Sequence, residues 1–241
     1  MPCVVERAMD PAGVDTDLRS GRWETRSLVR AGVAAAVLLV SLAWVVVASG
    51  SPTRVDVWVF DLTSQWTDAA PWAVDLATLI GALTGEVGAT VVAVSATLVL
   101  AARRRWSLAL FVGLSGAVGV VLVEVGKRAA GRLRPDGAEA FIDSGLDRSF
   151  PSGHAAAGIY VYGSIAVLLI LVGQRAGAAL IRWSGWVLLA FGVSIGASRI
   201  VLGVHWATDV LAGWALGSAV LLLLAAATRP DDAPLPIGGR G

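Results

Sequence analysis

Apolar residues in this chain gather into long runs separated by short polar segments. The runs cover about residues 31–49, 79–101, 108–125, 155–172, 185–203 and 206–227. A helix needs about 20 mostly apolar residues to cross the hydrocarbon core of a bilayer, and each run has close to that length. The pattern therefore predicts an all-α, polytopic membrane protein with six transmembrane helices in one bundle.

The segments outside these runs are polar or mixed. Residues 1–27 and 228–241 combine prolines with charged side chains, so we predict disordered tails on either side of one membrane domain at 28–227. Residues 52–77 intersperse tryptophans with aspartates, which is typical of a segment at the membrane interface, although a plain connecting loop is an alternative. The first run also resembles a signal peptide, but its length and its distance from the N-terminus favour an uncleaved helix.

The composition supports a membrane protein and limits the classes of molecule that it is expected to bind. Hydrophobic residues make up 56% of the chain and charged residues 15%, against roughly 45–50% and about 25% in soluble domains. The mean hydropathy is +0.73. A net charge of +1 indicates no nucleic-acid partner, and the single cysteine excludes an internal disulfide. From composition alone we therefore expect only the surrounding membrane lipids as partners.

The distribution of basic residues predicts the orientation. If the N-terminus is cytoplasmic, the segments on that side carry most arginines, as the positive-inside rule requires, and both termini lie in the cytoplasm. One cluster then falls on the outer side and breaks the rule: Lys127, Arg128, Arg132, Arg134 and Arg148. An anionic substrate would explain this cluster, and binding of lipid head groups without chemistry is the alternative.

Three short polar motifs lie at predicted helix ends that share this outer side, so they can converge. The first runs from Lys127 to Arg134-Pro135, the second is Pro151-Ser152-Gly153-His154, and the third runs from Ser198-Arg199 through His205 to Asp209.

These residue types suit phosphoryl transfer, which needs cations around the phosphate oxygens, an in-line nucleophile and an acid for the leaving oxygen. Lys127, Arg134 and Arg199 supply positive charge, and arginine binds phosphate in a bidentate manner. Ser152 and Gly153 precede the fourth predicted helix, where backbone N–H groups can point at an anion.

Both histidines of the chain fall in these motifs. If His205 begins the sixth helix, Asp209 lies one turn on and can bind one ring nitrogen, which leaves the other free to attack. His154 is then available to protonate the leaving oxygen. A structural or capping pair is the alternative for His205 and Asp209. A zinc site formed by the two histidines and Asp209 would lack a further Cys or His ligand, and the neighbouring cations would oppose a metal ion. We therefore expect neither metal nor cofactor.

Together the motifs resemble those of the type 2 phosphatidic acid phosphatase family: K-x6-R-P, P-S-G-H and S-R-x5-H-x3-D, with every fixed position filled. The resemblance covers about residues 28–227. It implies a metal-independent mechanism through a phosphohistidine, with His205 as nucleophile, Asp209 orienting it, and His154 as acid and later as base. It further implies a phosphate-binding set: Lys127, Arg134, Ser152, Gly153 and Arg199.

We therefore expect a multi-pass plasma-membrane hydrolase that acts on a lipid phosphate or diphosphate from the extracytoplasmic side. The outward site and the apparent bacterial composition favour a polyprenyl diphosphate, followed by phosphatidic acid or phosphatidylglycerol phosphate. A phosphotransferase of the same fold and a non-catalytic lipid-binding protein are the rival hypotheses. The motifs do not fix Arg128, Arg132 and Arg148, which we interpret as ligands of a second phosphate or of the membrane surface.

Overall fold

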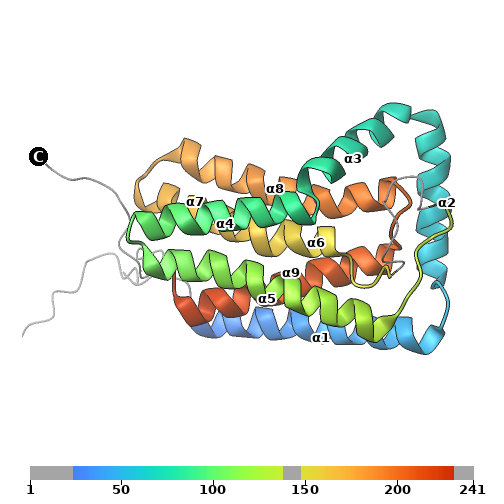
Figure 1. The fold of residues 1–241 in the computed structure, drawn as a ribbon, viewed down its shortest axis with the longest axis horizontal. Coiled ribbons are helices and arrows are strands. Elements are labelled where there is room, and N and C mark those ends of the chain that lie inside the picture. The colour runs from blue at the N-terminus through green and yellow to red at the C-terminus, as the bar shows by residue number, and fades with distance from the viewer. Residues whose placement is uncertain (1–23, 138–147, 231–241) are drawn as a thin grey trace, which may run out of the picture.

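A computed structural model describes residues 24–137 and 148–230 of the chain (Figure 1). The predicted tails at 1–27 and 228–241 lie largely outside these residues, although the first helix already begins at Thr25. The helices are α1 (Thr25–Ser49), α2 (Arg54–Ala69), α3 (Pro71–Thr84), α4 (Glu86–Ala102), α5 (Trp106–Ala130), α6 (Gly153–Ala157), the π-helical η3 (Gly158–Tyr162), α7 (Gly163–Arg175), α8 (Ala179–Val201) and α9 (Ala207–Thr228).

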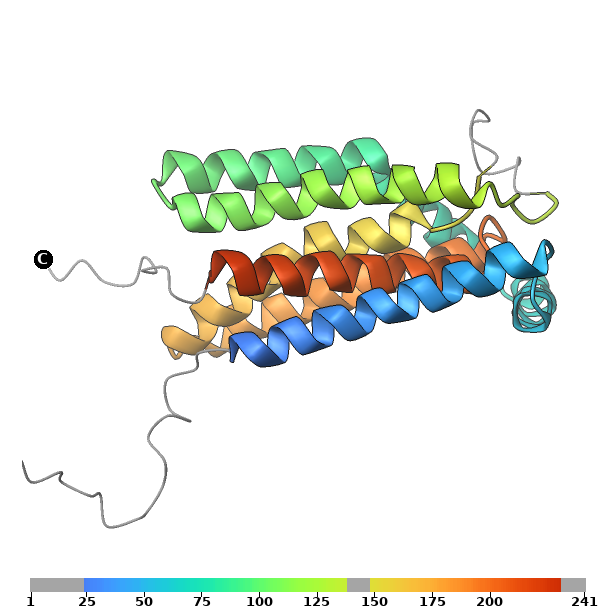
Figure 2. The same cartoon turned by 90° about the horizontal axis from the view of Figure 1, so that it is seen from below.

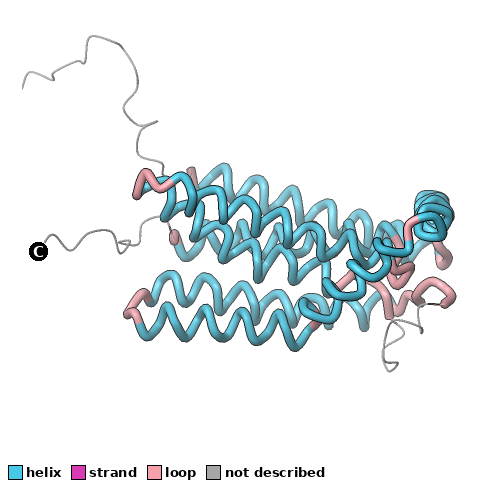
Figure 3. Tube along the Cα trace, turned by 90° about the horizontal axis from the view of Figure 1, so that it is seen from above, coloured by secondary structure: helices cyan, strands magenta, loops and turns pink. Residues whose placement is uncertain are grey.

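The long helices lie side by side along one axis, and α1 packs along α9 (Figures 1 and 2). The first and last described residues lie at one end of this bundle, while α2 crosses the other end (Figure 1). Connecting segments gather at the two ends (Figure 3). The described part of the chain contains no strand, only an isolated bridge between Leu133 and Arg148. The predicted all-α class is confirmed for these residues.

Within residues 24–137 and 148–230, five helical segments are long and apolar enough to span a membrane: α1, α5, the continuous α6–η3–α7, α8 and α9. The predicted second span at 79–101 is not one straight helix. Its residues divide between α3 and α4, which meet at Gly85 with a bend of 48°. The pair counts as a sixth span only if this broken helix crosses the bilayer as a unit. Hydropathy alone did not reveal the break, because the residues on both sides of it are apolar.

Residues 52–77, for which an interfacial segment or a loop was expected, form α2 and the first half of α3. A capping box starts α2: the Thr53 hydroxyl accepts from the Asp56 N–H, and the Asp56 carboxylate accepts from the Thr53 N–H. Pro71 at the first turn of α3 suits a helix start because its missing N–H has no partner to lose there. The turn between the helices thus redirects the chain from the crossing α2 back toward the bundle.

The π-helical turn η3 lies where α6–η3–α7 approaches α8 most closely. A Cβ added at Gly158 would overlap the backbone carbonyl of Gly192, and the reverse also holds. Only glycine at both positions permits this contact. The close approach holds α6, and the residues at its start, against the neighbouring helices of the bundle.

Candidate active site

The three motifs converge at the end of the bundle that α2 crosses. The first motif covers the last turn of α5 and the residues after it, the second begins α6, and the third joins α8 to α9. A backbone hydrogen bond of 3.0 Å from the Ser152 N–H to the Asp209 carbonyl ties the second motif to the third. Arg134 of the first motif donates to the Val204 carbonyl at 2.8 Å. The convergence that the sequence predicted is therefore present.

His205 lies just before α9, which begins at Ala207, and its side chain is buried. Its Nδ1 atom lies 3.5 Å from Asp209 Oδ2, longer than a usual hydrogen bond but typical of catalytic pairs before substrate binds. On the other side of the ring, Arg134 Nη1 lies 3.0 Å from Nε2. A guanidinium can only donate, so Nε2 presents its lone pair and the proton belongs on Nδ1.

The pKa of His205 is lowered to about 4. Burial is the largest cause because it disfavours the imidazolium, and the positive charges of Arg134 and Arg199 act in the same direction. Asp209 opposes them and raises the pKa. The ring is consequently neutral near pH 7, which is the form that can act as a nucleophile.

Two further buried cations lie at this end of the bundle, Arg199 beside His205 and Lys127 beside His154. Arg199, on the last turn of α8, is 4% exposed, and Lys127, on the last turn of α5, is 6% exposed. The Arg199 Nε–H has no hydrogen-bond partner among the described residues. Its guanidinium lies against Gly81 of α3, where an added Cβ would overlap Nη1. A buried guanidinium with an unused donor is costly unless an anion completes it, so this arrangement fits a phosphate.

The second motif contributes the other histidine of the site, His154. Ser152 is the N-cap of α6, and its hydroxyl accepts from the Ala155 N–H at 3.4 Å. His154 hydrogen-bonds to the Gly81 carbonyl and interacts electrostatically with His205. The backbone of Gly153 lies beside Lys127: a Cβ at this glycine would be 3.9 Å from Nζ. The expected phosphate-binding residues therefore surround the same space as the two histidines.

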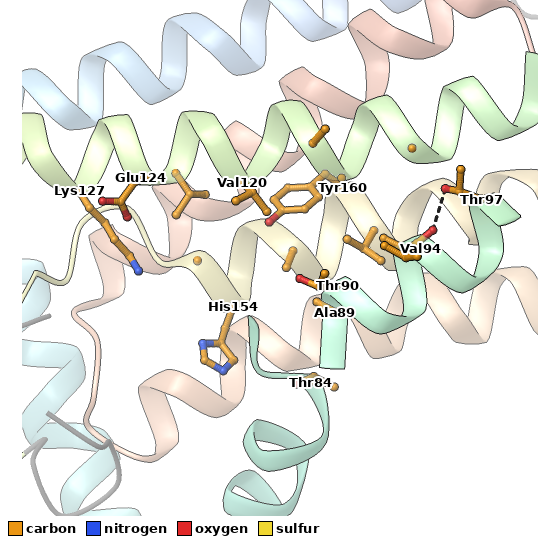
Figure 4. Close-up of a pocket in the computed structure, with 18 of the residues that line it drawn as sticks. Thr84, Ala89, Thr90, Val94, Thr97, Val120, Glu124, Lys127, His154 and Tyr160 are labelled. Carbon is orange, nitrogen blue, oxygen red and sulfur yellow. Dashed lines mark hydrogen bonds between the residues drawn. The ribbon is translucent and has the colours of Figure 1, made fainter. Parts of the chain in front are cut away.

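An apolar cavity of about 550 Å³ opens from this space and runs between α4 and α5. Figure 4 shows Lys127 and His154 at one end, Tyr160 in the middle and Thr97 near the other end. On α5, the lining extends from Lys127 to Gly113, a distance of about 21 Å at 1.5 Å per residue. Half of a hydrocarbon core of about 30 Å is about 15 Å, so the cavity is longer than one leaflet is deep.

The sequence prediction for Arg132 was wrong. Its side chain is only 8% exposed and binds two carboxylates, so it faces neither a second phosphate nor the membrane surface. One of these carboxylates belongs to Asp56 of α2, which the sequence analysis missed entirely. The spacing of Thr53 and Asp56 matches the capping pattern that starts many helices, and could have revealed α2, but not the contact with Arg132.

The donors at the site favour an anion over a metal ion. Among the described residues, no group of three or more His, Cys, Asp and Glu side chains is arranged to hold a metal. Among the residues that the structure describes, Asp209 is the only carboxylate beside His205, and it is already bound by Arg132. The arginines around the ring would also oppose a divalent cation.

Comparison with known proteins places this geometry in a family. Residues 104–231, more than half of the chain, match the PAP2 superfamily. The chain belongs to this superfamily. The match covers all three motifs, so the resemblance inferred from them is confirmed.

Three relatives of this PAP2 chain illustrate the range of its family. It is 32% identical over 131 residues to undecaprenyl-diphosphatase of Sulfolobus acidocaldarius, covering 52% of this chain and 58% of that protein. It is 38% identical over 96 residues to phosphatidylglycerophosphatase B of Bacillus subtilis, covering 39% and 44%. It is 36% identical over 111 residues to lipid A 1-phosphatase of Porphyromonas gingivalis, covering 43% and 21%. The matched segments thus span less than two thirds of each relative.

A solved structure supports the fold over a larger part of this PAP2 chain. The crystal structure of the transmembrane PAP2-type phosphatidylglycerolphosphate phosphatase from Bacillus subtilis superposes with a TM-score of 0.63 at 26% identity. The alignment covers 80% of this chain and 94% of that one. This likeness and the apolar helices together support a multi-pass membrane protein.

Proposed function

We propose that this protein is a membrane-embedded, metal-independent phosphatase that hydrolyses a lipid phosphate or diphosphate through a phosphohistidine. One observation carries the proposal: a buried, neutral histidine and a second histidine share a cationic space at the mouth of a long apolar cavity. The cations suit the phosphate, and the cavity suits a lipid tail. The names of the PAP2 relatives, which act on lipid phosphates, support the same class of substrate.

In the proposed first step, the Nε2 lone pair of His205 attacks phosphorus and the bond from phosphorus to the leaving oxygen breaks. His154 donates its proton to that oxygen, so the product leaves as an alcohol or a lipid monophosphate. Lys127, Arg134 and Arg199, with the backbone at Ser152 and Gly153, hold the remaining phosphate oxygens. A bound phosphate dianion favours the protonated form of His154, which is the form that the step requires.

In the second step, the now neutral His154 accepts a proton from water as the water oxygen attacks the phosphohistidine. The bond between phosphorus and Nε2 breaks, inorganic phosphate leaves, and both histidines return to their starting forms. Asp209 holds the Nδ1–H side of His205 throughout and stabilises the positive charge that develops on the ring. The cycle needs only substrate and water.

The cavity supports a long-chain substrate. Most of its lining is apolar, and Lys127 and His154 lie at one end of it. A tail placed between α4 and α5 would bring the head group to the site while remaining in the bilayer. Because the cavity is longer than one leaflet is deep, we place a polyprenyl diphosphate first, followed by phosphatidic acid and phosphatidylglycerol phosphate.

The topology is part of the proposal. The described ends of the chain lie at the end of the bundle opposite the site (Figure 2). With six spans, the broken α3–α4 pair included, the positive-inside rule places both termini in the cytoplasm and the site on the extracytoplasmic side of the plasma membrane. Labelling of single cysteines introduced at Arg103 and Arg54 in intact cells, after replacement of Cys3, would test this orientation.

The test of the function is phosphate release by the detergent-purified protein from these three lipids, in EDTA, by wild type and His205→Asn. Arg54→Gln, which removes an exposed charge at the same end of the molecule, is the control. Release that survives EDTA and Arg54→Gln but disappears in His205→Asn supports the proposal. No release, or release that persists in His205→Asn, overturns it.

A further inference from the structure

The guanidinium of Arg132 bridges two buried carboxylates beside the active site. Its Nη2 donates to Asp56 Oδ2 at 2.6 Å, and its Nη1 donates to Asp209 Oδ1 at 2.6 Å and to the Thr208 hydroxyl at 2.7 Å. Both carboxylates are fully buried. Arg132 fills none of the fixed positions in the three motifs, yet it contacts the residue that orients His205.

Arg132 determines which way the Asp209 carboxylate faces. Oδ2 accepts from the Trp206 N–H at 2.9 Å and faces His205 Nδ1, while Oδ1 accepts from Arg132. Two donors on different oxygens fix both the position and the plane of a carboxylate. Without Arg132, the backbone N–H alone would hold Asp209, and the group could rotate away from the imidazole.

Asp56 in turn fixes Arg132. Its Oδ1 accepts from the Thr208 N–H at 2.8 Å, and its Oδ2 accepts from the Thr53 N–H at 3.0 Å. Burial acts to raise the pKa of Asp56, but the bonds from Thr208, Arg132 and Thr53 outweigh it and lower the pKa. A carboxylate that stays charged while fully buried needs a cation, and Arg132 is that cation.

The guanidinium also neutralises a repulsion. Without it, Asp56 and Asp209 would be two buried negative charges close together, which is strongly unfavourable. Arginine meets both carboxylates because its planar fork has donors on two nitrogen atoms, whereas lysine offers a single ammonium. A lysine at 132 would therefore keep the charge and lose the bridge.

From these contacts we propose that Asp56 and Arg132 are positioning residues for the nucleophile. Asp56 on the crossing helix α2 holds Arg132, Arg132 fixes Asp209, and Asp209 fixes the tautomer and the angle of the His205 ring. The arrangement makes α2 part of the catalytic apparatus although none of its residues reaches the phosphate. The kinetic part of this inference rests on His205 being the nucleophile proposed above.

The charges that face His205 predict how its titration responds. The groups that act directly on the ring are Asp209 on α9, Arg199 on α8, His154 on α6 and Arg134 after α5, whereas Arg132 acts through its ion pair with Asp209. Replacing Arg132 with a neutral residue leaves Asp209 with an uncompensated negative charge. That charge stabilises the imidazolium, so the titration of His205 moves to higher pH.

The test compares Arg132→Gln, Arg132→Lys and Asp56→Asn with two controls, Arg54→Gln and Asp61→Asn, which alter exposed charges on the same helix as Asp56. We expect kcat to fall about 10- to 100-fold in the two Arg132 variants and in Asp56→Asn, the loss that is typical when a residue that orients a metal ligand is replaced. KM should change little because the phosphate-binding cations remain. Arg132→Gln should also shift the acid limb of kcat/KM to higher pH, whereas Arg132→Lys, which keeps the charge, should shift it less.

A second measurement does not depend on activity. The chain has two histidines, so the NMR signals of selectively labelled histidine in detergent can be assigned with His154→Asn. The proposal expects the His205 titration to move upward in Arg132→Gln and to stay in place in Arg54→Gln. An unchanged titration, with unchanged kcat in a folded Arg132→Gln protein, overturns the positioning role. An inactive wild type with a shifted titration would instead overturn the proposed function and leave the coupling of Arg132 to His205 standing.

Discussion

Arg134 Nη1 lies 3.0 Å from His205 Nε2, the atom that would attack phosphorus. This contact assigns the lone pair to Nε2 and, together with burial, keeps the ring neutral. If Arg134 binds the phosphate as proposed, its guanidinium must turn from Nε2 to the phosphate oxygens when substrate binds. The same cation would then protect the nucleophile from protonation before binding and hold the phosphate afterwards.

The first prediction concerns pH. In the proposed mechanism His205 attacks only as neutral imidazole, and its pKa of about 4 lies below the usual 6.5. Because the pKa is lowered, the neutral form is present above about pH 4 and is lost as the pH falls through that value. The contribution of His205 to kcat/KM should therefore be constant from pH 7 to pH 5 and decline below. Kinetics with a buffer series at constant ionic strength would check this, and an acid limb of His205 near pH 6.5 would contradict it.

The second prediction concerns the covalent intermediate. In the proposed mechanism His154→Asn removes the acid of the first step and the base of the second, so turnover should fall about 10²- to 10⁴-fold. With an activated substrate whose leaving group needs no proton, the first step survives and the second stays slow. An acid-labile phosphoenzyme should then accumulate in His154→Asn. The phosphoenzyme should be absent from the double variant that also carries His205→Asn. If the double variant still retained covalent phosphate from a labelled substrate, the phosphate would belong to another residue.

The third prediction concerns the cavity between α4 and α5. Ala117 of α5 lines it, whereas Leu114 on the same helix does not. Ala117→Phe should raise KM for a long-chain lipid about tenfold, by obstructing apolar contact worth about 1–2 kcal/mol, and should leave a short-chain phosphate unaffected. Leu114→Phe is the matched control. Equal effects of the two variants on both substrates would exclude this cavity as the tail site.

The convergence of the three motifs could be predicted from the sequence better than the scaffold around them. Lys127, His154 and His205 became candidates because each lies in a short motif of chemically distinctive residues at a helix end. Asp56 could not, because its partner Thr208 is 152 positions away and no local pattern records such a contact. The bend at Gly85 was missed for a different reason: apolar runs report burial in lipid, and they do not report the direction of the helix.

The last prediction uses that bend. Gly81, one turn before it, accepts a hydrogen bond from His154 through its carbonyl and lies against the Arg199 guanidinium, with no room for a Cβ. Gly81→Ala should displace Arg199 from the phosphate and lower kcat/KM about 10- to 100-fold, as misplacements of about 1 Å do. Ala82→Ser, which adds one atom at the exposed neighbouring position, should have no effect. Alanine would be tolerated at 81 only if Arg199 had little part in binding phosphate, so the pair of variants tests the role of Arg199 without removing its charge.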